Sequence, residues 1–191
     1  MNEYKRLATL PVTDFEEIES PEDGREHDAN SPATDVLTDF LRARPLMIEQ
    51  NTDLETAREM MKRAHVRLKL VIDRHEHFKG LISLLDLLSV RVMQAAERTG
   101  LRPAELTVAD VMTPRARLHA IDIRQIEHAT IGDLLLTMQS YGDQHVLVVD
   151  SARQRIRGIV SSSDIARILH VPVDIAERAC SFAEIYAAVR A

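Results

Sequence analysis

The strongest constraint on this chain is a seven-residue stretch that occurs twice. Gly-Leu-Ile-Ser-Leu-Leu-Asp occupies Gly80–Asp86, and Gly-Ile-Val-Ser-Ser-Ser-Asp occupies Gly158–Asp164. A second pair of similar stretches, at residues 33–38 and 108–113, lies 75 residues apart and precedes the first pair in the same order. A repeat of this length is too long for a solenoid unit and suits two small α/β halves. The sequence therefore predicts a duplicated fold.

The residues around the repeated stretches predict the same elements in both halves. In each copy a glycine precedes two branched apolar residues, a serine and, three positions later, an aspartate, which is typical of a strand that turns into a helix. We expect an α/β (α+β) fold of two β-α-β-β-α repeats. The expected strands are 45–49, 68–72, 79–82, 145–149 and 156–160, with a further strand within 119–123 or 125–127. The expected helices are one that follows Asp53 or Thr52 and buries Leu54, Ala57, Met60, Met61 and Ala64, one at about 84–99 that ends at Gly100, and one that begins near Ile131.

Charge and turn residues predict the limits of the folded part. Residues 1–35 hold ten acidic and three basic side chains, whereas residues 36–191 hold 20 and 21. We expect an acidic, partly disordered N-terminal extension at 1–33, a first domain at 34–100 and a second at 101–191. The second domain includes an additional C-terminal helix at 182–190, because Ser181 and Glu184 form a capping-box pattern. The nearly neutral folded part has few aromatic residues, which disfavours nucleic-acid binding.

Composition also limits the cellular compartment and the kinds of catalytic or metal site that we expect. The chain has no apolar run long enough to cross a bilayer and no signal-peptide core near its start, so we expect a cytoplasmic protein without a membrane partner. Its single cysteine, Cys180, excludes an internal disulfide and has no evident histidine partner for a catalytic thiol. His75 and His77 could supply two ligands to a transition metal, but a solvated hairpin tip is favoured there. We therefore expect no metal site.

These motifs together resemble tandem CBS domains. The resemblance is carried by Asp-Val-Met-Thr at 110–113, by the apolar strand that ends in Val-Val-Asp at 148–150, and by Gly158–Asp164 with the isoleucine that follows. It covers about residues 33–170 and implies a paired unit, often called a Bateman module, whose two sheets pack in pseudo-twofold symmetry and form two clefts. It also implies binding of adenosine-containing ligands in these clefts and association as a homodimer.

Two interpretations of the serine–aspartate pair remain open at this point. A hydroxyl and a carboxylate beside the free N–H groups of a helix start could bind the ribose and phosphate of a nucleotide. The same spacing is also a capping box, which needs no ligand.

The resemblance assigns ligand contacts to residues of both copies. The ribose-binding aspartate corresponds to Asp164 and Asp86, and the accompanying hydroxyls to Ser161, Ser163 and Ser83. The first copy has Leu85 where the second has Ser163, so the two sites are expected to be unequal. Four further residues complete the set. The basic residue near phosphate corresponds to His145 in the second copy and to neighbouring Arg67 in the first, and the linker threonines near the base are Thr38 and Thr113.

The expected function is regulatory binding and not catalysis. We expect an adenosine ligand such as AMP, ADP, ATP or S-adenosylmethionine, no required cofactor, a homodimer, and a separate regulated protein of unknown identity. One alternative is a ligand-independent dimerisation or scaffold protein in which both serine–aspartate pairs only cap helices. Another is a nucleotide- or metal-dependent enzyme, which the lack of a clustered acid–base constellation disfavours.

Overall fold

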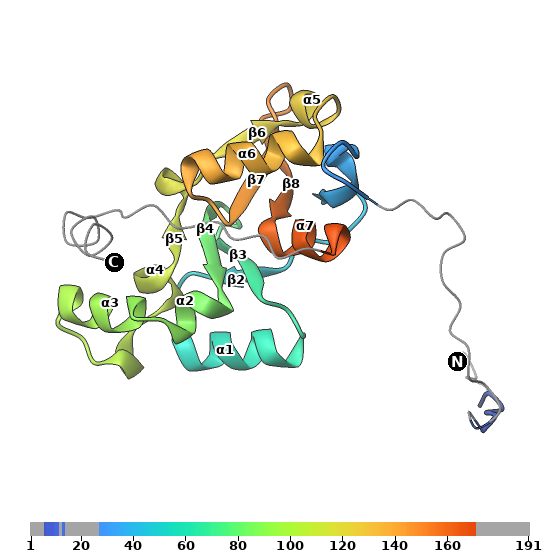
Figure 1. Cartoon of the computed structure of the whole chain (residues 1–191). Helices are drawn as coiled ribbons and strands as arrows, with labels where there is room; N and C mark the ends of the chain where they lie inside the picture. The colour runs from blue at the N-terminus through green and yellow to red at the C-terminus, as the bar shows by residue number, and fades with distance from the viewer. Residues whose placement is uncertain (1–5, 12, 14–26, 171–191) are drawn as a thin grey trace, which may run out of the picture.

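The chain folds into two four-stranded sheets with helices packed against them (Figure 1). The structure is a computed structural model, and it describes residues 6–11, 13 and 27–170. Most of the acidic extension, the expected helix at 182–190 and Cys180 lie outside the described residues. Within the described part of the chain, no helix is both long enough and apolar enough to cross a membrane.

The first sheet has the strand order β2-β3-β4-β5, in which β2 is parallel to β3 and the other pairs are antiparallel. Its strands are β2 (Met47–Glu49), β3 (Leu68–Ile72), β4 (Phe78–Ser83) and β5 (Thr113–Pro114). The helices of this half are α1 (Leu54–Arg63), α2 (Leu84–Leu88), α3 (Arg91–Thr99), α4 (Val108–Val111) and the 3-10 turn η2 (Pro103–Glu105).

The second sheet repeats this arrangement with the order β6-β7-β8-β1. Again the first two strands are parallel and the others antiparallel. Its strands are β6 (Ala120–Asp122), β7 (His145–Asp150), β8 (Arg155–Ser161) and β1 (Thr38–Asp39). The helices are α5 (Ile123–Ile126), α6 (Ile131–Tyr141) and α7 (Ser162–Leu169), with 3-10 turns η1 (Ala33–Val36) and η3 (Arg115–Arg117). The β-α-β-β-α order expected for both halves is thus confirmed.

The two halves exchange their edge strands. The edge strand of each sheet comes from the segment that, in the sequence, precedes the first long helix of the other half. Strand β1 pairs with β8 of the second half, and β5 pairs with β4 of the first half. The 3-10 turn η1 packs its buried residues into the second core, and α4 packs its own into the first core. Figure 1 shows the blue segment that leads to β1 beside the orange second half. The domain limits 34–100 and 101–191 stay a prediction. The sheets do not follow these limits, because each sheet includes an edge strand from the other segment.

The repeated glycines permit this exchange. Gly80 lies opposite Pro114, and Gly158 lies opposite Asp39. A Cβ atom on Gly80 would overlap the carbonyl oxygen of Thr113, and one on Gly158 would lie 2.6 Å from the carbonyl oxygen of Thr38. The edge strand can therefore approach each sheet only because the position opposite has no side chain.

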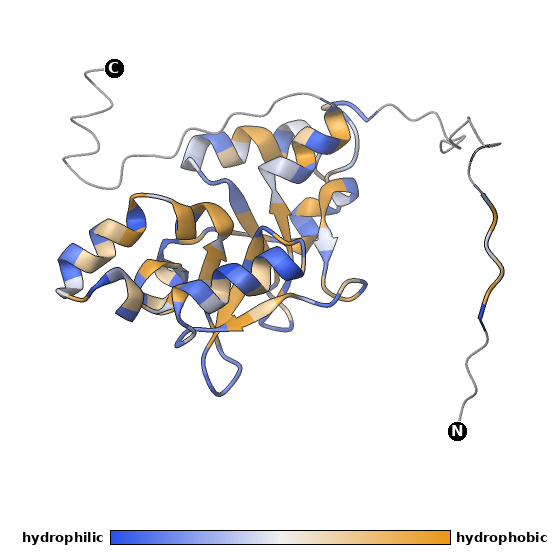
Figure 2. Cartoon of the chain, turned by 90° about the horizontal axis from the view of Figure 1, so that it is seen from below, coloured by the Kyte–Doolittle hydropathy of each residue, from blue (hydrophilic) through white to orange (hydrophobic). Residues whose placement is uncertain are grey.

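The two sheets contact each other through a small apolar core of their own. Leu70 and Leu81 of the first sheet pack with Leu147 and Ile159 of the second, and each of these side chains is at least nine-tenths buried. In Figure 2 the central strands are largely orange, and the surrounding helices carry both orange and blue segments. This shared core joins the halves and positions the ends of their strands side by side.

Two expectations about the helices were wrong, and the alternatives for the extra strand are resolved. The helix expected at about 84–99 is two helices, because the chain becomes extended at Ser89, whose hydroxyl accepts from the Arg91 N–H and donates to the Asp86 carbonyl. Met60 is 40% exposed and Ala64 is also exposed, so of the five residues that α1 was expected to bury only Leu54, Ala57 and Met61 are buried. Of the two stretches considered for the extra strand, 119–123 contains β6, whereas 125–127 overlaps α5. Gly100 ends α3 in the left-handed conformation, as expected.

Candidate functional site

A cleft of about 1100 Å³ lies between the two halves. Its walls include Ser83 and Asp86 at the junction of β4 and α2, Thr113 of β5, and His145 at the start of β7. These four residues belong to the nine that the resemblance to CBS domains assigned to ligand contacts. His145 belongs to the second sheet, whereas Ser83 and Thr113 belong to the first sheet and Asp86 to the helix that follows β4. Neither half therefore forms the cleft alone.

Ser83 and Asp86 form a complete capping box at the start of α2. The Ser83 N–H and hydroxyl each donate to Asp86 Oδ2 at 2.7 Å, and the Asp86 N–H donates to Ser83 Oγ at 3.1 Å. The local sequence explains this, because β4 ends at Ser83 in an extended conformation and the helix starts directly after it. The side chain of Asp86 is only 13% exposed. The capping interpretation of the motif is therefore satisfied in the first copy.

Arg91 is a member of this site that the sequence did not identify. Its Nη1 donates to Asp86 Oδ1 at 2.8 Å and to Thr113 Oγ1 at 3.1 Å. One guanidinium thus joins the two residues that the resemblance placed near the ribose and the base. The break at Ser89 turns α3 so that Arg91, five residues after Asp86, faces back toward the motif. The sequence predicts one continuous helix at about 84–99, in which no turn would bring Arg91 back to Asp86, so it does not indicate this contact.

The opposite wall carries a cluster of aromatic and charged residues that the sequence also missed. His119 Nδ1 and Asp143 Oδ2 are 2.6 Å apart, and the His119 ring lies 4.2 Å from the ring of Tyr141 between centroids. All three residues line the cleft. They come from the start of the second half and from the end of α6, two places with no motif that could have marked them.

His145 lies in the half-buried part of the same wall. Burial lowers the pKa of His145 below its ordinary value of 6.5, and the negative charges of Asp86, Asp164 and Asp143 oppose this shift. The burial effect is the larger one, so the imidazole is neutral at pH 7. A neutral imidazole can donate or accept hydrogen bonds but brings no charge to a phosphate.

The second copy of the motif has a similar but more exposed arrangement. Ser161 Oγ donates to Asp164 Oδ2 at 2.9 Å and accepts from the Asp164 N–H at 3.1 Å. Arg167 Nη2 donates to Asp164 Oδ1 at 2.9 Å. Ser163 is exposed, as is Leu85, its counterpart in the first copy. The capping contacts thus occur in both halves.

The cleft does not bring together all nine predicted ligand contacts. Thr38 is paired with Ile159 in the second sheet, and Arg67 is exposed, with its carbonyl accepting from the Leu84 N–H. Five of the nine do not line the cleft, namely Thr38, Arg67, Ser161, Ser163 and Asp164. The roles of all nine residues stay predictions.

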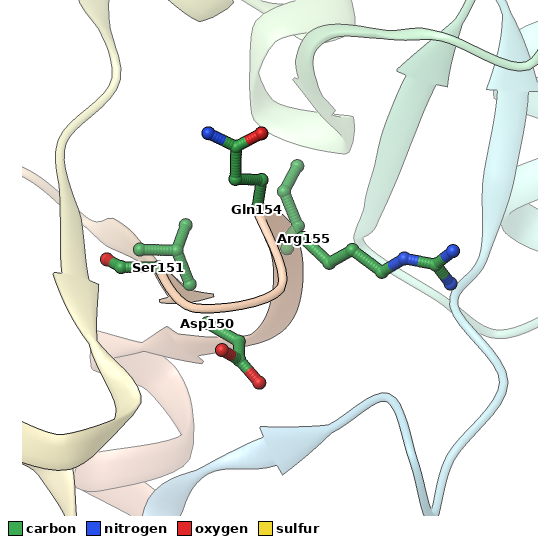
Figure 3. A pocket seen from close by; sticks show the side chains of 6 residues that line it. Asp150, Ser151, Gln154 and Arg155 are labelled. Carbon is green, nitrogen blue, oxygen red and sulfur yellow. The ribbon is translucent and has the colours of Figure 1, made fainter.

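A smaller hollow of about 370 Å³ lies at the turn between β7 and β8. Figure 3 shows that the side chains of Asp150, Gln154 and Arg155 point in different directions around this turn. Groups that diverge in this way do not converge on one ligand. No cluster of three or more metal-ligating side chains occurs among the residues that the structure describes, those around His75 included.

Comparisons with known proteins agree with this architecture. The CBS domain family model matches residues 35–92 and 126–171, which is more than half of the chain. An uncharacterized conserved protein from Pyrococcus horikoshii has a similar structure, with a TM-score of 0.54 and 19% identity over 78% of this chain and 99% of that one. The CBS domain pair of protein MJ0100, solved with 5′-methylthioadenosine and S-adenosyl-L-methionine, gives a TM-score of 0.51 and 21% identity over 73% and 96%.

No curated protein sequence matches the chain. The two family matches fall on the two halves of the fold, and each includes one copy of the serine–aspartate motif. The chain therefore belongs to the CBS domain family and is a tandem CBS-domain pair, or Bateman module.

Proposed function

We propose that this protein is a regulatory module that binds an adenosine-containing ligand in the cleft between its two halves. The observation that carries the proposal is that Ser83, Asp86, Thr113 and His145, taken from both halves of the fold, line one cavity of about 1100 Å³. Cavities of roughly 300–1,000 Å³ are typical of small-molecule sites in proteins. The ligands named for the MJ0100 pair, 5′-methylthioadenosine and S-adenosyl-L-methionine, support an adenosyl compound.

The proposed contacts follow from the chemistry of each group. The Asp86 carboxylate accepts hydrogen bonds from the ribose hydroxyls, and the Ser83 and Thr113 hydroxyls supply donors and acceptors beside it. His145 offers a neutral imidazole from the opposite half. A ligand held by these groups contacts both sheets, so its affinity depends on how the halves are arranged.

This dependence is the proposed basis of regulation. A ligand that binds one arrangement of the halves or subunits more tightly shifts the population toward it. By linkage, a partner that recognises the same arrangement then binds more tightly as well. We propose that this partner is a separate protein and that the module acts as a homodimer. AMP, ADP, ATP and S-adenosylmethionine are the compounds to be tested first.

The second copy of the motif is proposed as a weaker, separate site. It contains Ser161, Ser163 and Asp164, and we assign to it the two other predicted contacts that do not line the described cleft, Thr38 and Arg67. The more exposed Asp164, at 36% against 13% for Asp86, would give a ribose less protection from water. Weaker electrostatic contacts are expected at the more hydrated carboxylate.

Calorimetric titration tests the proposal directly. AMP, ADP, ATP, S-adenosylmethionine and 5′-methylthioadenosine are each titrated into the full chain and into Asp86→Ala and Asp164→Ala. We expect at least one compound to bind, with the larger loss in Asp86→Ala. Asp133→Ala is the matched control, because Asp133 forms a capping box with Thr130 away from the cleft. Absence of binding by all five compounds at millimolar concentration would overturn the proposal.

A ligand-independent dimerisation module is the second candidate, and one observation favours it. Both carboxylate oxygens of Asp86 already accept hydrogen bonds within the chain, so the motif is satisfied without a ligand. Under this alternative the chain forms a stable dimer whose melting temperature does not change across the five compounds. Sedimentation measured with and without each compound separates the two candidates.

A further inference from the structure

We propose that the C-terminal segment of this chain docks on an exposed apolar surface of helices α2 and α3, at the edge of the cleft. The segment is the helix expected at residues 182–190, which lies outside the described residues. The surface, here called the α2–α3 surface, consists of four large apolar side chains that are each more than half exposed: Leu85, Leu88, Val90 and Met93. The inference goes beyond the proposed function, because docking does not depend on a ligand.

The side chains of the α2–α3 surface are grouped, which distinguishes them from scattered exposed residues. Leu85 and Leu88 are three residues apart in α2, and Val90 and Met93 are three residues apart at the start of α3. Leu85 and Val90 both line the cleft, so the two pairs meet at its edge. Single exposed apolar residues are common on proteins, whereas a group of them marks an interaction surface.

Both helices already bury another side in the first core. The residues that they bury there are Leu87 of α2 and Ala95 and Ala96 of α3. A surface helix normally has one apolar side, which faces the core, and a polar side that faces water. Since α2 and the start of α3 are apolar on a second side as well, we infer that a second partner covers them.

The segment 182–190 has the pattern of a helix that fits such a surface. Its large apolar residues occupy positions i, i+3, i+4 and i+7, which lie on one face of a helix: Phe182, Ile185, Tyr186 and Val189. Glu184 falls on the opposite face. A helix this short is marginally stable in water and depends on packing of its apolar face. The segment therefore requires an apolar surface, and the α2–α3 surface supplies one.

The connection to the segment is long enough for it to dock within the same chain. The described part of the chain ends at His170, directly after α7. Residues 171–181 can span about 36 Å when they are extended. A domain of this size has a radius of gyration of about 15 Å. The segment can therefore reach the first half from the end of α7 without a second copy of the chain.

Hydrogen exchange measured on the full chain tests the docking. We expect the amides of residues 182–190 to exchange at least about tenfold more slowly than unprotected amides. Leu88→Glu and Ile185→Glu each place a carboxylate in the apolar contact and should remove this protection. Leu136→Glu is the matched control, because Leu136 is 69% exposed on α6 and lies outside the α2–α3 surface. Unprotected amides in the unchanged chain, or equal protection in Leu88→Glu and Leu136→Glu, would overturn the proposal.

Cross-linking provides a second measurement that does not depend on the charged variants. Cys180 is the only cysteine of the sequence and lies two residues before the segment. A short bis-maleimide should join Cys180 to the introduced thiol in Leu88→Cys or Met93→Cys within one chain, and should do so much less in Leu136→Cys. If the cross-links instead join two chains, and the protection of residues 182–190 falls on dilution, a second copy covers the surface and docking within the chain is wrong.

Discussion

The guanidinium of Arg157 binds the carboxylate of Asp39, 118 positions earlier, through two parallel hydrogen bonds of 2.8 Å each. Asp39 is in β1 and Arg157 in β8, so this pair fastens the exchanged edge strand to the second sheet. The side chains are 13% and 23% exposed. The hydrogen bonds from Arg157 lower the pKa of Asp39, which is consistent with an ionised, well-ordered pair.

Loss of this pair should destabilise the fold. We expect Asp39→Ala to lower the free energy of unfolding by about 2 kcal/mol, because it leaves a partly buried guanidinium without its carboxylate. Urea unfolding of both single variants and the double variant with Arg157→Ala measures the coupling. The exposed pair of Glu59 and Arg63 is the control and should give less than about 1 kcal/mol. Equal coupling energies in the two pairs would contradict the prediction.

The two motif glycines should differ in their effect on ligand binding. Gly80→Ala and Gly158→Ala each push a methyl group against the edge strand, and each should lower the free energy of unfolding by about 1–3 kcal/mol. Only Gly80 faces Thr113, which lines the cleft. Gly80→Ala should therefore also weaken AMP binding, measured by calorimetry at a temperature where both variants are folded. Equal AMP affinity in the two variants would mean that the position of β5 does not affect ligand binding, and would contradict the prediction.

The sequence predicted the repeated elements because apolar periodicity and capping residues are local signals. Leu68–Ile72 reads as a strand from its own composition, and Gly100 marks the end of a helix without reference to any neighbour. The exchange of edge strands was not predictable in this way, since β1 and β5 are each two residues long. Their pairing depends on Gly80 and Gly158, whose role is visible only beside the opposing strand.

The residues of the candidate site were likewise predictable only where they form a local sequence pattern. Ser83 and Asp86 could be named because their spacing is fixed within one turn of chain. Arg91 could not, because a break at Ser89 that no glycine or proline marks turns it back toward Asp86. His119 and Asp143 are 24 positions apart and meet through the packing of the second half. Contacts of this kind depend on tertiary structure and leave no local pattern.

His145 should make the stability of the fold depend on pH. Its pKa is lowered in the folded state by burial, against the charges of Asp86, Asp164 and Asp143, whereas the unfolded chain takes up the proton near 6.5. Below this pH the unfolded state therefore binds more protons, and the free energy of unfolding falls as the pH falls. Urea unfolding from about pH 7 to about pH 5 should show a weaker decline in His145→Gln.

The exposed histidine of the β3–β4 hairpin, His75, provides the control for this measurement. His75→Gln controls for the replacement of a histidine by glutamine, and the decline should be weaker in His145→Gln than in His75→Gln. A decline that is the same in His145→Gln as in the unchanged chain would mean that other groups cause it.

Ser83→Ala and Ser161→Ala should separate the capping role of the motif from its proposed binding role. Each serine caps its helix through equivalent contacts, because the N–H of the aspartate three residues later donates to its Oγ at 3.1 Å. Each substitution should lower the free energy of unfolding by about 1 kcal/mol. Only Ser83 lines the cleft, so Ser83→Ala should weaken AMP binding, by about three- to tenfold, a change of ~0.7–1.4 kcal/mol.

Restoring a hydroxyl distinguishes the two roles further. Ser83→Thr retains both the cap and a hydroxyl in the cleft, and it should preserve stability and AMP affinity together. If Ser83→Ala loses stability but binds AMP as tightly as the unchanged chain, the serine acts only as a cap. If Ser161→Ala instead loses the affinity, the ligand occupies the second copy of the motif, and the assignment of the cleft at Asp86 as the principal site is wrong.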